Sequence, residues 1–293
     1  MCSVRRGIQL SPLVILEPLA PLQEDSAQCA CQARIDQTKD LFSELGLVMD
    51  LQFVPLLQIQ RDLLEMPRGV ERFRKYLRVI LNSEGNDAEL VPLILMNPMA
   101  KDHVAHLLDK LVRLNGEAVG AEAAREASVG LAGCPHSYRV GLVVADDAMG
   151  GWTNRYASEF SLICLSREAL RRGWLSAVLW SSEEADTQKV REAVLMTACR
   201  AAYLQTHGAA STLRDLLAQE GWVLSKSGCQ EPTLEQDDLA YTRDVIGAQL
   251  EASDQPTLVA CLFGDRAALA LGYPPQGLSD RAGLALALHE ARS

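Results

Sequence analysis

The sequence predicts a helix-rich α/β protein with a small, mainly parallel sheet of about four strands and a helical N-terminal region packed on it. Four short apolar runs lead to this prediction, and they cover residues 90–96, 140–145, 175–180 and 258–263. Each run is followed after a turn by a helical pattern, as in βα units. The runs are continuously apolar and not alternating, which is typical of parallel strands that are covered on both faces.

The composition is that of an acidic protein with a real core. Of its 293 residues, 48% are hydrophobic, which is enough to bury a core without staples. The net charge of -10 is spread along the chain, which argues against nucleic acid as a partner. No run is long and apolar enough for a membrane helix, and the residues after Arg5 and Arg6 do not read as an export signal. We therefore expect a cytoplasmic protein whose eight cysteines are free thiols.

Two regions are expected along the chain. Residues 1–86 would form a helical N-terminal region, and three prolines predict that its leader, residues 1–34, is extended. Residues 87–293 would form the α/β core. Within this core, apolar residues at helical spacing predict helices over 101–114, 117–131, 187–206, 211–221 and 239–250.

The N-terminal region is expected to contain two helices, over residues 35–45 and 70–81. The second helix has an apolar face that would point inward. Its basic residues would lie on the solvent side. The residues of the apolar face are Val70, Phe73, Leu77, Ile80 and Leu81, and the basic stretch is Arg68, Arg72, Arg74, Lys75 and Arg78.

Two of the predicted strands are followed by pairs of carboxylates. Asp146 and Asp147 come directly after the first of these strands, and Glu183 and Glu184 come just after the second. Because parallel strands share a direction, their ends lie at one edge of the sheet, where open α/β proteins usually bind ligands. Other polar residues expected at this carboxyl edge are Asn97, Ser181 and Asp265.

This acidic edge is a candidate site for a divalent metal. Mg²⁺ or Mn²⁺ takes oxygen ligands, and Asp146, Asp147 and Glu183 supply them. For Glu183 and Glu184 a structural role is the alternative, because Ser181 and Glu184 have the spacing of a helix capping box. Asp146 and Asp147 are also ordinary turn residues.

Arg155 and His207 are the candidate catalytic residues. Gly150 and Gly151 suggest a sharply bent loop, and Arg155 follows it with a guanidinium that can hold an anion. As an alternative, Arg155 is an ion-pair partner of the neighbouring carboxylates. His207 is a candidate acid or base if the fold carries it to the acidic edge, but a histidine is also favoured there by the end of a helix.

Other metal-ligating residues give weaker signals. His103 and His106 lie three residues apart on one predicted helix, as two metal ligands would, but they also flank its buried side. Cys29, Cys31, Cys134 and His136 would suffice for tetrahedral zinc if the fold brought them together. Free thiols are the simpler interpretation.

These observations support two hypotheses of different classes. The first is an enzyme that acts on a small anionic substrate with a divalent metal at the acidic edge. The alternative is a non-catalytic binding or assembly protein, such as a homo-oligomer, in which the acids are helix caps and turns. In that case Trp152, Trp174 and Trp180 would contribute to a partner surface, since tryptophan is enriched at interfaces.

Overall fold

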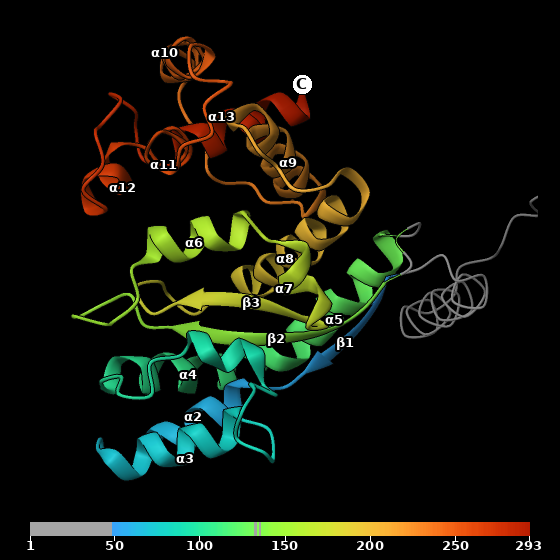
Figure 1. Ribbon diagram of the computed structural model, residues 1–293, viewed down its shortest axis with the longest axis vertical. Helices are drawn as coiled ribbons and strands as arrows, with labels where there is room; N and C mark the ends of the chain where they lie inside the picture. Colours follow the sequence, from blue (N-terminus) through green and yellow to red (C-terminus); the bar gives the residue numbers. More distant parts are fainter. Residues whose placement is uncertain (1–48, 132–133, 135) are drawn as a thin grey trace, which may run out of the picture. The chain divides into compact units, whose positions relative to one another are not determined.

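The structure is a computed structural model that describes residues 49–131, 134 and 136–293. Its centre is a sheet of three parallel strands in the order β1-β2-β3, and Figure 1 shows helices around it. The strands are β1 (Asp50–Val54), β2 (Ser137–Ala145) and β3 (Trp174–Trp180). Helices form more than half of the described residues, so the prediction of a helix-rich α/β protein with a parallel sheet is confirmed.

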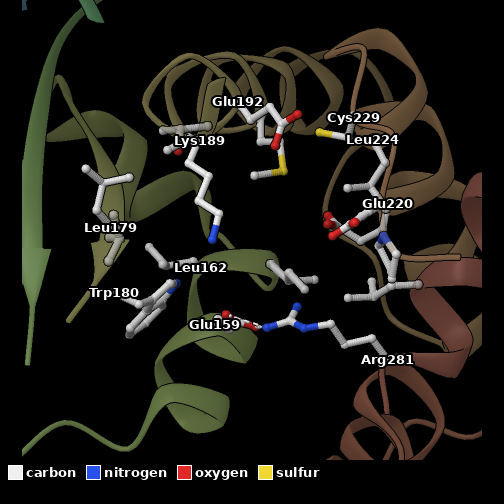
Figure 2. Close-up of a pocket in the computed structure, with 18 of the residues that line it drawn as sticks. Glu159, Leu162, Leu179, Trp180, Lys189, Glu192, Glu220, Leu224, Cys229 and Arg281 are labelled. Atoms are coloured by element: carbon white, nitrogen blue, oxygen red, sulfur yellow. Dashed lines mark hydrogen bonds and ion pairs between the residues drawn. The ribbon is translucent and has the colours of Figure 1, made fainter. Parts of the chain in front are cut away.

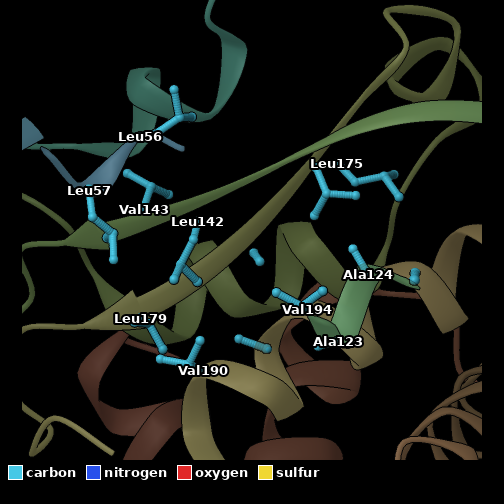
Figure 3. Packing of buried hydrophobic residues seen from close by; sticks show 14 of the residues in the cluster. Leu56, Leu57, Ala123, Ala124, Leu142, Val143, Leu175, Leu179, Val190 and Val194 are labelled. Carbon is cyan, nitrogen blue, oxygen red and sulfur yellow. The ribbon is translucent and has the colours of Figure 1, made fainter. Parts of the chain in front are cut away.

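Both faces of the sheet are covered, which explains why β2 and β3 read as continuous apolar runs. On one face, helices α5 (Gly116–Gly130) and α8 (Thr187–His207) pack against the strands. Figure 3 shows side chains of this layer, where Val190 of α8 lies near Leu179 of β3. The other face of β2 carries Gly141, where an added Cβ would lie 2.5 Å from Leu56 and 2.8 Å from Pro92. Glycine at that position therefore allows the chain to approach the sheet closely.

On the β1 side of β2, a side chain takes the place of a neighbouring strand. β1 pairs with residues 137–141 only, which leaves the end of β2 without a neighbouring strand on that side. The side chain of Gln60, on helix α2 (Leu57–Glu65), fills this place. Its Nε2 donates to the carbonyl oxygen of Val144 at 2.7 Å, and its Oε1 accepts from the Val144 N–H at 3.0 Å. The amide of Gln60 thus pairs with Val144 as a peptide group of a longer strand would.

The remaining helices of the first half lie on this side of the sheet. Helix α4 (Asp102–Arg113) packs on α2, which also contacts α3 (Val70–Ile80). A 3₁₀ helix, η1 (Val91–Leu95), contacts β2 and β3. In Figure 1, α2, α3 and α4 lie together below the sheet.

After β3, the regular elements of the chain are all helices. Helices α6 (Arg155–Ile163) and α7 (Arg167–Arg171) connect β2 to β3. A second cluster of buried apolar residues is formed mainly by later helices, and α9 joins it to α8. None of the helices in the described residues is long and apolar enough to cross a membrane. These later helices are α9 (Leu213–Lys226), α10 (Gln236–Gly247), α11 (Gln255–Phe263), α12 (Asp265–Ala270) and α13 (Ala282–Arg292).

Two of the four predicted strands are wrong. Residues 90–96 contain η1, with Pro92 in its first turn, where a missing N–H costs little. Residues 258–263 lie in α11, which begins after Asp254; the side chain of Asp254 accepts from the Thr257 N–H at 3.0 Å. A short apolar run is equally compatible with a buried helix. The strand β1 was not predicted.

The buried face of α3 also differs from the prediction. Val70 and Phe73, expected inside, are 64% and 39% exposed, whereas Arg72, expected in solvent, is buried. The Arg72 guanidinium donates to the carbonyl oxygens of Leu64 at 3.1 Å and Met66 at 2.6 Å. These carbonyls belong to the C-terminal end of α2, where a cation is favoured.

The predicted regions meet in this sheet. β1 lies within residues 1–86 and pairs with β2, which lies within residues 87–293. The predicted leader and the predicted helix over 35–45 fall outside the described residues. The predicted helices over 101–114, 117–131, 187–206, 211–221 and 239–250 correspond to α4, α5, α8, α9 and α10.

We expect Gln60→Leu to lower the free energy of unfolding by roughly 1–3 kcal/mol, because it leaves the buried N–H and C=O of Val144 unpaired. Urea unfolding followed by circular dichroism measures the change. Gln58→Leu is the matched control, since Gln58 is an exposed residue of the same helix. Equal midpoints for the two variants would contradict the role assigned to Gln60.

Candidate functional site

The ends of β2 and β3 lie side by side, because these strands are parallel neighbours. Asp146 and Asp147 follow β2, and Ser181 and Ser182 follow β3. The Ser181 N–H continues the ladder by donating to the carbonyl oxygen of Ala145 at 2.9 Å. The two strand ends therefore meet at one edge of the sheet.

Asp146 is a buried carboxylate that contacts three polar side chains. Its Oδ2 accepts from Asn97 Nδ2 at 2.8 Å, while its Oδ1 lies 2.8 Å from His103 Nε2 and 3.2 Å from Ser181 Oγ. These partners belong to the segment after η1, to α4 and to the end of β3. Asp146 is only 1% exposed. It joins three separate segments and faces no open solvent.

The bend after Asp146 requires glycine. Gly150 has a φ of +78°, in the left-handed region. At Gly151 an added Cβ would lie 2.2 Å from the backbone oxygen of Asp146, which is closer than any side chain allows. The sharply bent loop that the sequence suggests is therefore present, and it folds back on Asp146.

Asp147 binds the loop that follows β3. Its Oδ1 accepts from the Ser182 N–H at 2.9 Å, and its Oδ2 accepts from Ser182 Oγ at 2.6 Å. Ser181 Oγ also lies 3.1 Å from Asp147 Oδ1. Asp147 thus makes the contacts of a residue that stabilises a turn.

Glu183 and Glu184 do not form the expected capping box. Helix α8 begins after Asp186, whose side chain accepts from the Gln188 N–H at 2.8 Å, so its start lies beyond Ser181 and Glu184. Glu183 forms ion pairs with Arg155 and with Lys189, the second at 3.1 Å. The residues between β3 and α8 form a turn of their own, and this turn directs Glu183 toward these cations.

Arg155 lies at the centre of an ion-pair network. Its guanidinium contacts Glu183 and, at 2.7 Å, Glu159, and it lies over the ring of Trp180 at 5.2 Å. Burial alone would lower the pKa of Arg155, but Glu159 and Glu183 outweigh this effect and raise it. Burial would likewise raise the pKa of Glu183, whereas Arg155 and Lys189 lower it. Both groups are therefore held in their charged forms.

The other predicted site residues are dispersed. His207 is exposed at the last residue of α8, where its ring stacks on Tyr203. A helix of 21 residues is about 30 Å long, so His207 lies far from the acidic edge at which α8 begins. Asp265, expected at this edge, lies after α11. Its carboxylate accepts hydrogen bonds from the N–H groups of residues 276–278.

The histidines and tryptophans singled out in the sequence also lie in different surroundings. His103 belongs to the Asp146 cluster, whereas His106 is exposed. Trp174 and Trp180 are buried, and Trp152 is 58% exposed. The possible zinc set is not tested, because Cys29 and Cys31 fall outside the described residues.

A metal at Asp146, Asp147 and Glu183 would compete with the protein for these carboxylates. It would have to displace Asn97 and His103 from Asp146, and Arg155 from Glu183. Within residues 49–131, 134 and 136–293, no three His, Cys, Asp or Glu side chains are grouped so that they could hold a metal ion. A metal role for the three carboxylates stays a prediction.

A cavity of about 260 Å³ opens beside the end of β3. We name it the α8 cavity, because one stripe of α8 forms much of its wall, together with parts of β3, α6, α9 and α13. Figure 2 shows that the side chain of Lys189 extends into it, with Glu192 above and Glu159 and Arg281 on the opposite side. Its charged lining residues are Arg155, Lys189, Arg200, Arg281, Glu159, Glu183, Glu192, Glu220 and Glu231.

Most of these charges are paired with one another. Arg200 and the fully buried Glu220 form a bidentate pair, with contacts of 2.9 Å and 2.6 Å, that joins α8 to α9. Burial alone would lower the pKa of Arg200, but Glu220 raises it. Arg281 places one nitrogen 2.8 Å from both oxygens of Glu159. These pairs fix the wall of the cavity.

Lys189 and Glu192 have fewer partners. The ammonium of Lys189 contacts one carboxylate, that of Glu183, and its side chain is 42% exposed. Glu192 accepts from Gln188 Nε2 at 2.8 Å, and in the part of the chain that the structure describes no basic group lies within 4 Å of its carboxylate. Both residues retain hydrogen-bonding capacity toward a bound molecule.

The α8 cavity was not predicted from the sequence. Its charged residues come from helices that are distant in the sequence, and only Arg155 and Glu183 were singled out. One signal was present: Lys189, Glu192 and Arg200 lie in a largely apolar helix, at spacings of 3 and 8 residues that place them on one face. Charged residues on the inward side of a buried helix indicate an internal ion pair or a cavity.

We expect Glu220→Gln to lower the free energy of unfolding by roughly 3–5 kcal/mol, because it leaves the charge of Arg200 buried without a partner. Chemical denaturation measures the loss. Glu251→Gln is the control, since Glu251 pairs with Arg214 at 2.7 Å on the surface. The double variant Arg200→Met with Glu220→Leu is expected to be more stable than Glu220→Gln, and the reverse order would contradict this account.

A titration with Mg²⁺ and Mn²⁺ tests the metal prediction. Because Asp147 and Glu183 already have protein partners, we expect the midpoint of thermal unfolding to stay constant as either ion is added. A metal that binds the native state alone would raise the midpoint with concentration. A rise that Asp147→Asn abolishes would establish the metal site and overturn our assignment of Asp147 to the turn.

No protein-family model, no curated protein and no solved structure matches this chain. The fold and the α8 cavity are thus interpreted from their own geometry.

Proposed function

We propose that this protein binds a small molecule with an acidic group in the α8 cavity, and that Lys189 is the residue that meets this group. The observation that carries the proposal is the position of the Lys189 ammonium: it extends into the cavity and has one carboxylate contact. An ammonium has three donors, so two remain for a ligand.

The surrounding cations support Lys189 without competing with it. Arg155, Arg200 and Arg281 are held by Glu159, Glu183 and Glu220 in close pairs. Rigid pairs of this kind keep their side chains in place, which lowers the entropy lost when a ligand binds. In this proposal Arg155 positions Glu183 and Lys189, and it does not bind the ligand directly.

The place of the cavity agrees with its proposed role. It lies at the carboxyl end of β3, and ligands of open α/β proteins usually bind at such ends. Apolar side chains such as Leu162 and Leu179 line the rest of the wall, as in most small-molecule sites. Asp146 and Asp147 are absent from the lining and serve as structural residues of the two strand ends.

A thermal-shift screen with small carboxylates and phosphates tests the proposal. We expect at least one compound to raise the midpoint, and we expect Lys189→Met to weaken its binding by about 10-fold or more, since a hydrogen bond to a charged group contributes roughly 1.5–3 kcal/mol. Isothermal titration calorimetry gives the dissociation constants.

Lys110→Met is the matched control for that experiment. Lys110 contacts Glu184 at 3.0 Å, much as Lys189 contacts Glu183, but it lies outside the cavity. Equal weakening by the two substitutions would point to a general charge effect. The absence of binding by every compound would contradict the proposal.

A further inference from the structure

The free edge of β3 supplies the α8 cavity with backbone groups. The Arg139 N–H donates to the Gly173 carbonyl oxygen at 2.8 Å, and the Ser181 N–H donates to the Ala145 carbonyl oxygen at 2.9 Å. The odd-numbered residues of β3 therefore direct their N–H and C=O groups toward β2. In a parallel ladder the N–H and C=O of alternate residues point to opposite edges. The even-numbered residues therefore direct theirs away from the sheet.

The protein satisfies some of these groups itself. The carbonyl oxygen of Ser176 accepts from Thr197 Oγ1 at 3.3 Å, and that of Trp180 accepts from the Glu183 N–H at 3.0 Å. Val178 lies between them, is half-buried and lines the cavity. No group of the described residues forms a hydrogen bond with its N–H or C=O. A donor and an acceptor on one residue are therefore available to a bound molecule.

The opposite side of the sheet shows what fits such a residue. There the side-chain amide of Gln60 donates to the carbonyl oxygen of Val144 and accepts from its N–H. In the primary amide of Gln60, one N–H and the C=O point the same way, so this amide binds both groups of Val144. A trans peptide amide directs its N–H and C=O in opposite directions, so it binds one of the two groups, as each amide of a peptide does at a sheet edge.

We propose that the ligand of the α8 cavity is a short peptide with free ends, of about dipeptide size, whose amide N–H donates to the carbonyl oxygen of Val178. Its carboxylate meets Lys189, and its ammonium meets Glu192, which has no basic partner among the described residues. This inference rests on the proposed function, because it names the ligand class of the same cavity. Opposite charges on one ligand match the opposite charges of the two α8 residues.

The volume limits the length of the peptide. A cavity of about 260 Å³ is smaller than the usual range for drug-sized ligands, roughly 300–1,000 Å³. The hydrogen bond from Thr197 Oγ1 to the carbonyl oxygen of Ser176 also occupies the free edge of β3 two residues before Val178. One amide, with one residue on each side of it, is the unit that this geometry accommodates.

The test compares ligands that differ in one group each. The probes are Ala-X and X-Ala dipeptides, screened by thermal shift and then measured by calorimetry. For the best dipeptide we expect the ester analogue, which lacks the amide N–H, to bind about 3- to 10-fold more weakly, the effect of one neutral hydrogen bond. Since only the ligand changes, misfolding of a variant cannot produce this result.

A second comparison tests the ammonium contact. Glu192→Gln is expected to weaken the dipeptide by about 10-fold and to leave its N-acetylated analogue unchanged, because that analogue has no ammonium. Equal binding of amide and ester, or equal effects of Glu192→Gln on both ligands, would overturn the inference.

The two proposals fail in different ways. If no dipeptide binds while simple carboxylates bind in a manner that depends on Lys189, the proposed function stands and the peptide is excluded. If neither dipeptides nor simple carboxylates bind, both the proposed function and the peptide ligand are excluded.

Discussion

The buried carboxylate of Asp146 holds together the edge of the sheet at which β2 and β3 end. A charge removed from water must be paired or hydrogen-bonded to be tolerated. Asp146 obtains its partners from Asn97, His103 and Ser181, which are distant in the sequence. Satisfying one carboxylate therefore requires the segment after η1, helix α4 and both strand ends to meet at one point. Because Gly151 folds back against the same residue, the loop that leads to Arg155 and the α8 cavity begins from a fixed position.

The sequence predicted those parts of the fold that depend on local pattern. β2 and β3 were found because they are buried on both faces, and α4, α5 and α8 because their apolar residues recur at helical spacing. The run over 258–263 was assigned wrongly, since a fully buried helix is also continuously apolar. β1 was missed because it has only five residues, of which one is buried, so it forms no continuous apolar run.

The site was harder to predict than the fold. Asp146 and Asp147 were noticed because they follow a strand, but their sequence position does not say whether their oxygens face a ligand or the protein. The hydrogen bonds of Asn97 and Ser182 give both carboxylates partners within the protein, and these bonds depend on how separate segments come together. The same holds for Arg72. Its charge predicts an exposed side chain, whereas its guanidinium is buried because it donates to carbonyl oxygens at the end of α2.

Gln60 also determines how β1 and α2 are aligned with the sheet. It uses both atoms of its amide on Val144, and the neighbours of Val144 in β2 direct their N–H and C=O toward β3. A slip by one residue would leave the amide with no peptide group to bind, in addition to turning the side chains of β1 to the wrong face. The side chain thus acts as a register pin for a strand that is too short to define its own alignment.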